Sequence, residues 1–334
     1  MKINVSANVE VAVVGLGLMG CSIVVSLLAS GHQVVALAPI LGEKEKAINH
    51  IVDLLRHADR SNLLSKGLSA SVGALKVTDD YRDIATCKFV QECVIEDKEI
   101  KKVVYEKIEE QVSGNTIIAT NTSAIPISEL QTFVSHPNRF IGVHWAEPAY
   151  MTRFLEVTCG AKTDTDTAAY VMQLGGIWGK EPTLLKKDIR GFITNRLMYA
   201  VYREALTLVE NGETTMEDAD KVFRYDVGSW ITLMGIFRRM DFMGFADYID
   251  SFEGILPKLS NRTDVPDLMR PLVAAGARGI HNGKGFYDYD EKQAKAWEEA
   301  FAQFNKEIYD LATRYTEKHI REKVYNEEKK LSKI

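Results

Sequence analysis

The sequence predicts an α/β protein, with a doubly wound parallel sheet followed by an all-α C-terminal domain. Short apolar runs, typical of strands buried on both faces, recur through the first half with helical stretches between several of them. After about residue 187 these runs stop, and apolar residues recur at helical spacing instead. A chain of 334 residues is long enough for two or three domains, and we place them at 1–187, 188–290 and 291–334.

The first predicted unit is a strand, a glycine-rich turn, a helix and a second strand. The strand covers Val9–Val14, the helix Ser22–Ala29 and the second strand Gln33–Ala38, which is the length of a βαβ unit. A helix is predicted at Lys98–Gln111. Further strands are predicted at Phe89–Val94, Thr116–Ala119, Arg139–His144, Phe154–Thr158 and Thr183–Leu185.

The C-terminal part begins with a predicted helix over Phe192–Glu210, which Asn211 and Gly212 end. The segment from Glu291 to Ile334 is charged and is also predicted to be helical. Six of its apolar residues alternate at steps of four and three, as in a heptad seam: Trp297, Phe301, Phe304, Ile308, Leu311 and Tyr315. Such a seam either packs on its own domain or contacts a second subunit, and both interpretations are open.

Composition excludes several classes of protein. Hydrophobic residues make up 46% and charged residues 26%, which is the balance of an ordinary globular chain, and the net charge is −5. Without a basic excess, nucleic acid is not an expected partner. The four cysteines are scattered and form no metal-binding pattern, and the first ten residues lack the layout of a signal peptide, so we expect a cytoplasmic protein without a metal site.

The segment from Val11 to Gly42 contains no Asp, Glu, Lys or Arg, and it is long enough to raise the hypothesis of a membrane span. Glycines interrupt it at three positions, which favours two short buried elements around a turn. We therefore expect no contact with a membrane.

Gly15, Gly17 and Gly20 form a G-x-G-x-x-G pattern between the predicted strand and helix. The first glycine makes the tight turn, the second lets a pyrophosphate approach the backbone, and the third lets helix and strand pack closely. The helix N-terminus then attracts the phosphates. This context predicts a Rossmann-type dinucleotide site, with Gly15, Gly17, Leu18, Met19 and Gly20 as cofactor-binding residues.

One expected part of that site is missing. The second strand of a nicotinamide-binding unit usually ends in Asp or Glu, which binds the ribose 2′-hydroxyl, but here it ends in Ala38 and Pro39. No arginine stands there to receive a 2′-phosphate, and the nearest charged candidates alternate in sign: Glu43, Lys44, Glu45 and Lys46. NAD is the expected cofactor, and NADP is not excluded.

Five segments together resemble the 3-hydroxyacyl-CoA dehydrogenase family, which includes 3-hydroxybutyryl-CoA, carnitine and gulonate dehydrogenases and the lens protein lambda-crystallin. The resemblance runs from about residue 8 to Tyr289. Besides the glycine turn, it is carried by Asn121–Ile127, Arg139–Pro148, Phe154–Val157 and Gly191–Arg196, and its last motif is Gly283–Tyr289.

The resemblance implies that His144 is the general acid/base, with Glu156 as its orienting partner. Oxidation of a secondary alcohol requires removal of the hydroxyl proton, and an imidazole has a suitable ordinary pKa of about 6.5. Ser123 and Asn195 are implied as catalytic, substrate-binding polar groups. Read without the resemblance, His144 is a buried core histidine, Ser123 a turn residue and Asn195 a helix-start residue.

Cofactor contacts are implied for Glu96, Lys101 and Asn121, the first two beside the nicotinamide. The alternative for Glu96 and Lys101 is a solvated charge run at the start of a helix. Lys66, between Ser65 and Gly67, is a candidate partner for a CoA phosphate; the alternative is an ordinary surface lysine.

The implied function is hydride transfer between a nicotinamide cofactor and C3 of a 3-hydroxyacyl-CoA, in fatty acid metabolism, by a homodimer that associates through the helical domain. Met234–Phe237 departs from the family's Gly-Pro turn, and Arg238 and Arg239 follow it, which would suit an acidic substrate without CoA. Two alternatives are a 3-hydroxyisobutyrate-type dehydrogenase and a non-catalytic, crystallin-like structural protein with a weakened cofactor site.

Overall fold

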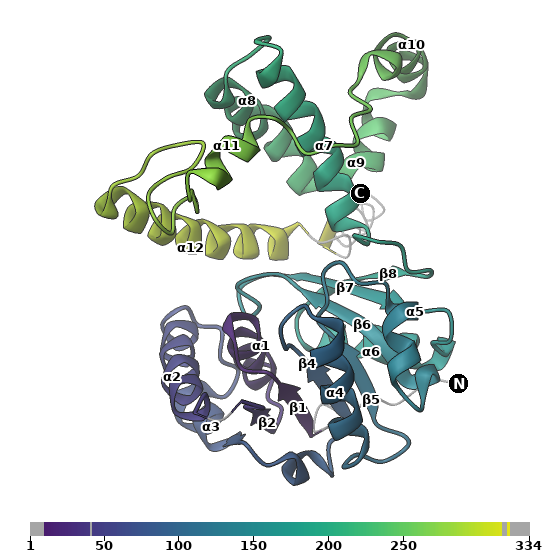
Figure 1. Ribbon diagram of the computed structural model, residues 1–334, viewed down its shortest axis with the longest axis vertical. Coiled ribbons are helices and arrows are strands. Elements are labelled where there is room, and N and C mark those ends of the chain that lie inside the picture. The colour runs from purple at the N-terminus through teal and green to yellow at the C-terminus, as the bar shows by residue number, and fades with distance from the viewer. Residues whose placement is uncertain (1–9, 41, 316–318, 321–334) are drawn as a thin grey trace, which may run out of the picture. The chain divides into compact units, whose positions relative to one another are not determined.

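The computed structural model describes residues 10–40, 42–315, 319 and 320. The chain divides into two compact units, Met1–Asn195 and Arg196–Ile334. Within the described residues the first unit contains an eight-stranded sheet in the order β3-β2-β1-β4-β5-β6-β7-β8 (Figure 1). The strands are β1 Val11–Val14, β2 Val34–Leu37, β3 Leu75–Thr78, β4 Phe89–Glu92, β5 Ile117–Thr120, β6 Phe140–Trp145, β7 Phe154–Cys159 and β8 Glu181–Leu185.

All neighbouring strands in the sheet pair in parallel except β6 and β7, which pair antiparallel. An antiparallel pair forms there because only a loop, and no crossover helix, connects Trp145 to Phe154. The predicted fold class, a doubly wound sheet of Rossmann type with a helical C-terminal domain, is confirmed.

Helices cover both faces of the sheet, and strand residues alternate between them. Val11 and Val13 pack in the hydrophobic cluster on one face, and Ala12 and Val14 pack in the cluster on the other. The first face is covered by α1 Leu18–Ala29, α2 Lys44–Arg60 and α6 Thr165–Ile177, and the second by α4 Lys98–Glu109 and α5 Ile127–Leu130. The short helix α3 Gly67–Gly73 precedes β3.

Helix α1 begins at Leu18, four residues before the predicted start at Ser22, because Gly17 is already its N-cap. Gly20 therefore lies inside the helix, where the absence of a side chain serves packing rather than a turn. No element was predicted at α2 or β3. Helix α2 is strongly charged and buries only a narrow stripe, and β3 is an edge strand with an exposed Lys76.

The regular elements described in the second unit are helices, as predicted. They are α7 Thr194–Glu210, which starts at the end of the first unit, α8 Met216–Val222, α9 Gly228–Met243, α10 Phe245–Ile255, α11 Met269–Ala274 and α12 Glu291–Arg314. The non-helical residues between α11 and α12 form isolated β-bridges of Lys284 with Gly279 and Asp288. None of the residues described from Arg196 onward is buried. Among the helices that the structure describes, none combines the length and the hydropathy needed to span a membrane.

Helix α12 starts where the sequence predicts, with a capping box between Asp290 and Gln293. Of the predicted heptad seam, Trp297, Phe301 and Phe304 are all exposed. The part of the predicted C-terminal helix beyond Ile320 lies outside the described residues.

Candidate active site

The surroundings of the turn between β1 and α1 account for each of its three glycines. Gly15 has φ +97°, and a Cβ there would lie 2.9 Å from the Cys93 carbonyl. A Cβ on Gly20 would lie 1.9 Å from the Gly15 carbonyl oxygen, so helix and strand touch backbone to backbone. A Cβ on Gly17, in contrast, would meet nothing within 4 Å. Gly17 is thus not needed for packing of the protein itself, and its open surface fits a pyrophosphate.

The first turn of α1 is also suited to an anion. It carries no acidic residue, and Gly17 offers no side-chain cap to the free backbone N–H groups. Leu18 is exposed at the start of the helix, whereas Met19 packs partly against the core. The turn therefore has the backbone, the space and the electrostatics that a dinucleotide requires.

The end of β2 carries no carboxylate. Ala38 is buried, and its N–H donates to the Thr78 carbonyl at 2.8 Å. Of the charged candidates nearby, Lys44 pairs with Asp79 at 3.5 Å, directly after β3. Asp79 is a carboxylate that sequence reasoning missed, because β3 itself was not predicted.

His144 and Glu156 lie directly opposite each other in the antiparallel register of β6 and β7. His144 Nδ1 lies 3.3 Å from Glu156 Oε2. The Glu156 side chain is buried, and its Oε1 accepts the N–H groups of Ile193 at 2.7 Å and Thr194 at 3.4 Å. Because an ionised carboxylate only accepts hydrogen bonds, His144 Nδ1–H donates, which leaves Nε2 for a substrate.

Aromatic rings hold the imidazole from two sides. The rings of Phe154 and Phe192 meet the ring of His144 edge-on, with centroids 5.7 and 6.1 Å away. His144 remains partly exposed, so it is a histidine with a fixed orientation and an accessible edge. This differs from the reading of His144 as a fully buried core residue.

Ser123 and Asn195 are brought together, although they are far apart in the sequence. Asn195 Nδ2 donates to the Ser123 carbonyl oxygen at 2.9 Å. The bond uses the Ser123 backbone and not its hydroxyl. Asn121 lies two residues earlier, where its Oδ1 accepts the Trp145 N–H at 2.9 Å and ties the ends of β5 and β6 together.

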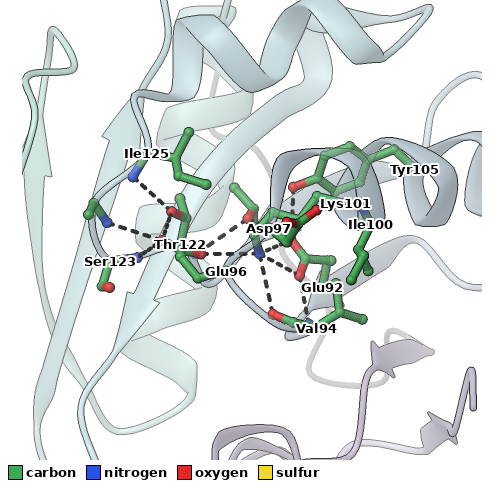
Figure 2. A network of polar contacts seen from close by, with 12 residues as sticks. Glu92, Val94, Glu96, Asp97, Ile100, Lys101, Tyr105, Thr122, Ser123 and Ile125 are labelled. Atoms are coloured by element: carbon green, nitrogen blue, oxygen red, sulfur yellow. Dashed lines mark hydrogen bonds and ion pairs between the residues drawn. The ribbon is translucent and has the colours of Figure 1, made fainter.

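A group of charged and polar side chains lies at the ends of β4 and β5, and we call it the Glu92 cluster (Figure 2). It consists of Glu92, Glu96, Lys101, Tyr105 and Thr120. The Lys101 ammonium donates to Glu92 at 2.8 and 3.0 Å and pairs with Glu96 at 3.4 Å. Tyr105 and Thr120 donate their hydroxyls to Glu92 at 2.8 and 2.7 Å. Burial and the neighbouring Glu92 charge raise the pKa of Tyr105, which keeps its phenol a donor.

The interpretation of Glu96 and Lys101 as a solvated charge run is wrong for Lys101, which is 1% exposed. Glu96 is partly exposed, and its Oε1 accepts the Thr122 hydroxyl and the N–H groups of Ser123 and Ala124 (Figure 2). Glu96 thereby shapes the loop that carries Ser123. Glu92 was missed by sequence reasoning, although a glutamate inside the strand predicted at Phe89–Val94 was a signal for it.

Lys66 does not join these residues. Its Nζ lies 3.3 Å from the Gly31 carbonyl, just beyond the C-terminal end of α1. The glycine turn is at the other end of this helix, about 18 Å away at 1.5 Å per residue.

Two charged side chains with buried polar atoms were also missed, both tied to the loop between β6 and β7. Glu147 Oε2 is buried without a hydrogen-bond partner among the described residues. Burial raises the pKa of Glu147 to about 7, against a lowering by a hydrogen bond from Ser22. Lys180 donates to the carbonyls of Ala149 and Thr152, and burial lowers its pKa to about 7.

A glycine turn that fits a dinucleotide, together with a carboxylate-oriented histidine on the same sheet, defines a nicotinamide-dependent dehydrogenase. Comparison with known families agrees. Residues 10–189 match the NAD binding domain of 3-hydroxyacyl-CoA dehydrogenase, and residues 191–289 match its C-terminal domain. The chain belongs to the 3-hydroxyacyl-CoA dehydrogenase family, and NAD is its cofactor.

Individual relatives have different substrates. The chain is 35% identical to 5-formyl-3-hydroxy-2-methylpyridine 4-carboxylate 5-dehydrogenase of Mesorhizobium japonicum, over 86% of this chain and 93% of the relative. It is 32% identical to L-carnitine dehydrogenase of Oceanobacillus iheyensis, over 85% and 94%. A crystal structure of the pyridine carboxylate enzyme, described as an NAD+-dependent dismutase, has a TM-score of 0.82 at 33% identity and covers 92% of this chain and 98% of that one. The (S)-3-hydroxybutyryl-CoA dehydrogenase of Ralstonia eutropha has a TM-score of 0.69 at 26% identity, covering 84% and 99%.

Proposed function

We propose that the protein transfers hydride between NAD and C3 of a 3-hydroxyacyl-CoA or a related 3-hydroxy acid. The observation that carries the proposal is the His144–Glu156 pair, held in direct register on the sheet that also carries the glycine turn. An alcohol oxidation needs a base at the hydroxyl and an acceptor for the hydride. The His144–Glu156 pair supplies the base, and the glycine turn would hold the cofactor that accepts the hydride.

His144 and Glu156 provide the proton transfer. When bound, NAD accepts the hydride at its nicotinamide ring or returns it. His144 Nε2 takes the substrate hydroxyl proton during oxidation and returns it during reduction. Glu156 holds the other ring nitrogen and stabilises the imidazolium that forms, while the N–H groups of Ile193 and Thr194 fix the carboxylate itself.

Ser123 and Asn195 are the proposed contacts to the substrate's oxygen and thioester region. Asn195 restrains the Ser123 backbone and Glu96 accepts from its N–H, so the Ser123 hydroxyl is presented from a fixed loop. Glu96, Lys101 and Asn121 are the proposed cofactor neighbours, in addition to the glycine turn. Because Lys66 lies at the far end of α1, we leave it out of this proposal.

A second candidate substrate is a small aromatic acid with an aldehyde group. It is favoured by the 35% identity and the 0.82 TM-score to the pyridine carboxylate dehydrogenase. The same His144–Glu156 pair serves this chemistry once water has added to the aldehyde: the hydrate gives up hydride from its carbon and a hydroxyl proton to His144, which leaves the carboxylic acid.

A substrate panel separates these candidates. Acetoacetyl-CoA with NADH, and L-carnitine, gulonate and 5-formyl-3-hydroxy-2-methylpyridine 4-carboxylate with NAD, would be assayed by absorbance at the reduced nicotinamide. We expect turnover of one class and a loss of about 10²- to 10⁴-fold in His144→Gln. A loss of less than threefold in this variant with the best substrate would contradict the mechanism.

The choice between NAD and NADP is tested by repeating the best assay with both cofactors. We propose that NAD is preferred over NADP, because Asp79 directly follows β3, the strand beside the one that ends before Ala38, and would oppose a 2′-phosphate. Failure of the protein to bind NAD, NADH, NADP or NADPH in calorimetry would favour the non-catalytic, crystallin-like alternative.

We propose three regions in chain order: a cofactor domain at residues 1–187, a substrate and dimerisation domain at 188–290, and a C-terminal extension at 291–334. The absence of any buried residue in the described part of the second unit supports a homodimer, because a helical domain of this size needs a core. Its apolar side chains include Phe237, Phe242 and Tyr225, which are 83%, 74% and 73% exposed. The four free thiols support a cytoplasmic location.

A further inference from the structure

The Glu92 cluster lies directly beside the glycine turn. A Cβ on Gly15 would lie 2.9 Å from Val94 Cγ1, so the turn rests against the segment that follows β4. Lys101 Nζ in turn lies 3.5 Å from the Val94 carbonyl oxygen (Figure 2). Val94 therefore bridges the predicted pyrophosphate site and the charged cluster.

Strand order shows which half of a dinucleotide faces the cluster. Strand β1 pairs with β2 on one side and with β4 on the other, and a dinucleotide crosses the sheet edge where the order reverses in this way. The adenosine ribose of a bound dinucleotide would lie at the end of β2, and its nicotinamide half would then lie beyond β1, at the ends of β4 and β5. Glu92 is the last residue of β4, and Thr120 is the last residue of β5.

The cluster holds more negative than positive formal charge. Glu92 and Glu96 are two carboxylates, and Lys101 is the ammonium group that pairs with both. Tyr105 and Thr120 contribute neutral hydroxyl donors. Glu92 is 0% exposed and Lys101 1%, so water screens the charges of this pair only weakly. Glu96 is the partly exposed member, with 39% of its side chain accessible.

We propose that the Glu92 cluster makes the site discriminate between the oxidised and the reduced cofactor. The nicotinamide ring of NAD+ is cationic, and the ring of NADH is neutral. The net negative charge of the cluster beside the ring therefore stabilises bound NAD+ more than NADH, which is held less tightly once hydride has arrived. The inference rests on the proposed function, because it takes the cofactor to be a nicotinamide dinucleotide bound at this turn.

The test is the binding of three ligands to the wild-type protein and to Glu92→Gln. Glutamine keeps the shape of glutamate and an oxygen for the donors, but it removes the charge. We expect the dissociation constant of NAD+ to rise by roughly 5- to 20-fold, as for loss of a unit charge within about 10 Å at an effective dielectric constant of 20. The constants of NADH and of ADP-ribose, which lacks the nicotinamide, should stay within about twofold.

Glu109→Gln is the matched control. Glu109 lies on the same helix, α4, and pairs with Arg139 at 3.5 Å, but it is eight residues beyond Lys101, or about 12 Å along the helix. Its neutralisation should leave the ratio of the NAD+ and NADH dissociation constants unchanged. If Glu92→Gln does not fold, Glu96→Gln removes the partly exposed charge of the same cluster and should raise the ratio as well.

Two outcomes would overturn the inference. In one, the ratio for NAD+ and NADH stays within twofold of the wild-type value in the folded cluster variants. In the other, affinity for ADP-ribose falls as much as that for NAD+, which would show that the cluster only maintains the shape of the site. If the wild-type protein binds none of the three ligands, the proposed function fails along with the inference.

Discussion

His144 and Glu156 face each other across the antiparallel strands β6 and β7, and the carboxylate that accepts from the imidazole also accepts the Ile193 N–H at 2.7 Å. One buried side chain thus fixes both the base and the segment that leads into α7. Glu156→Gln keeps the hydrogen-bonding shape but loses the charge that stabilises the imidazolium. We expect kcat to fall by about 10²- to 10⁴-fold, with the NADH dissociation constant nearly unchanged.

The control for this variant is Glu181→Gln on the neighbouring strand β8. Glu181 is an exposed carboxylate that pairs with Arg153 at 2.6 Å. Its neutralisation should leave kcat within about twofold. Equal losses of kcat in the two variants would contradict the prediction. They would mean that kcat depends on any carboxylate in this part of the sheet and not on the orientation of His144 by Glu156.

Gly17 and Gly20 should respond to alanine in opposite ways. In Gly20→Ala the new methyl group would lie 1.9 Å from the Gly15 carbonyl oxygen, so backbone must move, and we expect a loss of about 2–4 kcal/mol in the free energy of unfolding. In Gly17→Ala the methyl group meets nothing within 4 Å, so stability should fall by only about 1 kcal/mol, the difference between glycine and alanine as an N-cap.

The readout for Gly17→Ala is cofactor affinity. Its methyl group would occupy the surface predicted to receive the pyrophosphate, and we expect NADH binding, measured by fluorescence, to weaken at least tenfold. Chemical denaturation of both variants would establish the stability difference. Unchanged NADH affinity in a folded Gly17→Ala protein would place the pyrophosphate elsewhere.

Glu147 should make stability depend on pH. Burial raises its pKa in the folded protein to about 7 from an ordinary value of 4.5, so the folded state binds the proton more tightly than the unfolded chain. The stabilisation from protonated Glu147 is complete below pH 4.5 and is lost as the pH rises through 7. Glu147→Gln, which resembles the protonated form, should therefore gain stability over wild type between pH 5 and pH 8.

The expected gain at pH 8 is about 1–2 kcal/mol, after discounting for partial contact of Glu147 with solvent. Denaturation at pH 5 and pH 8 would measure it. Glu106→Gln, a change at an exposed position on α4, should show no such pH-dependent difference. A Glu147→Gln protein with the same pH dependence as wild type would contradict the burial effect.

A second copy of the chain should cover the apolar surface of the second unit. The thermal midpoint of an obligate dimer rises with protein concentration, because association and folding are linked. We expect a dimer in light scattering and a midpoint that increases over a hundredfold range of concentration. Phe237→Asp, at an 83% exposed position, should weaken the dimer if the interface includes α9. A stable monomer with a concentration-independent midpoint would contradict the proposal.

Local patterns predicted the sheet, the glycine turn and the change to helices, because these follow from periodicity and from the conformations open to glycine. Strand β3 and helix α2 escaped prediction, since an edge strand and a charged amphipathic helix leave a weak apolar signal. Ser123 and Asn195 came from family resemblance, and only the structure places them in contact.

Glu92 and Glu147 show why the rest could not be predicted. Both are single acidic residues in apolar surroundings, and their environment comes from segments that lie apart in the sequence. The partners of Glu92 are on α4 and β5, and the hydroxyl beside Glu147 is Ser22 on α1. The sequence does not distinguish Glu92, which accepts hydrogen bonds from three side chains, from Glu147, which has an unpartnered oxygen.

The antiparallel pairing of β6 and β7 determines which changes in length the protein can tolerate. Because His144 and Glu156 are matched by ladder register, residues added to the loop between the strands leave their separation unchanged. A single residue inserted within β7 before Glu156 would rotate that side chain to the opposite face of the sheet. Natural variation in length should therefore be absent from both strands, and also from Ala149–Thr152, because Ala149 and Met151 are buried and Lys180 donates to the carbonyls of Ala149 and Thr152.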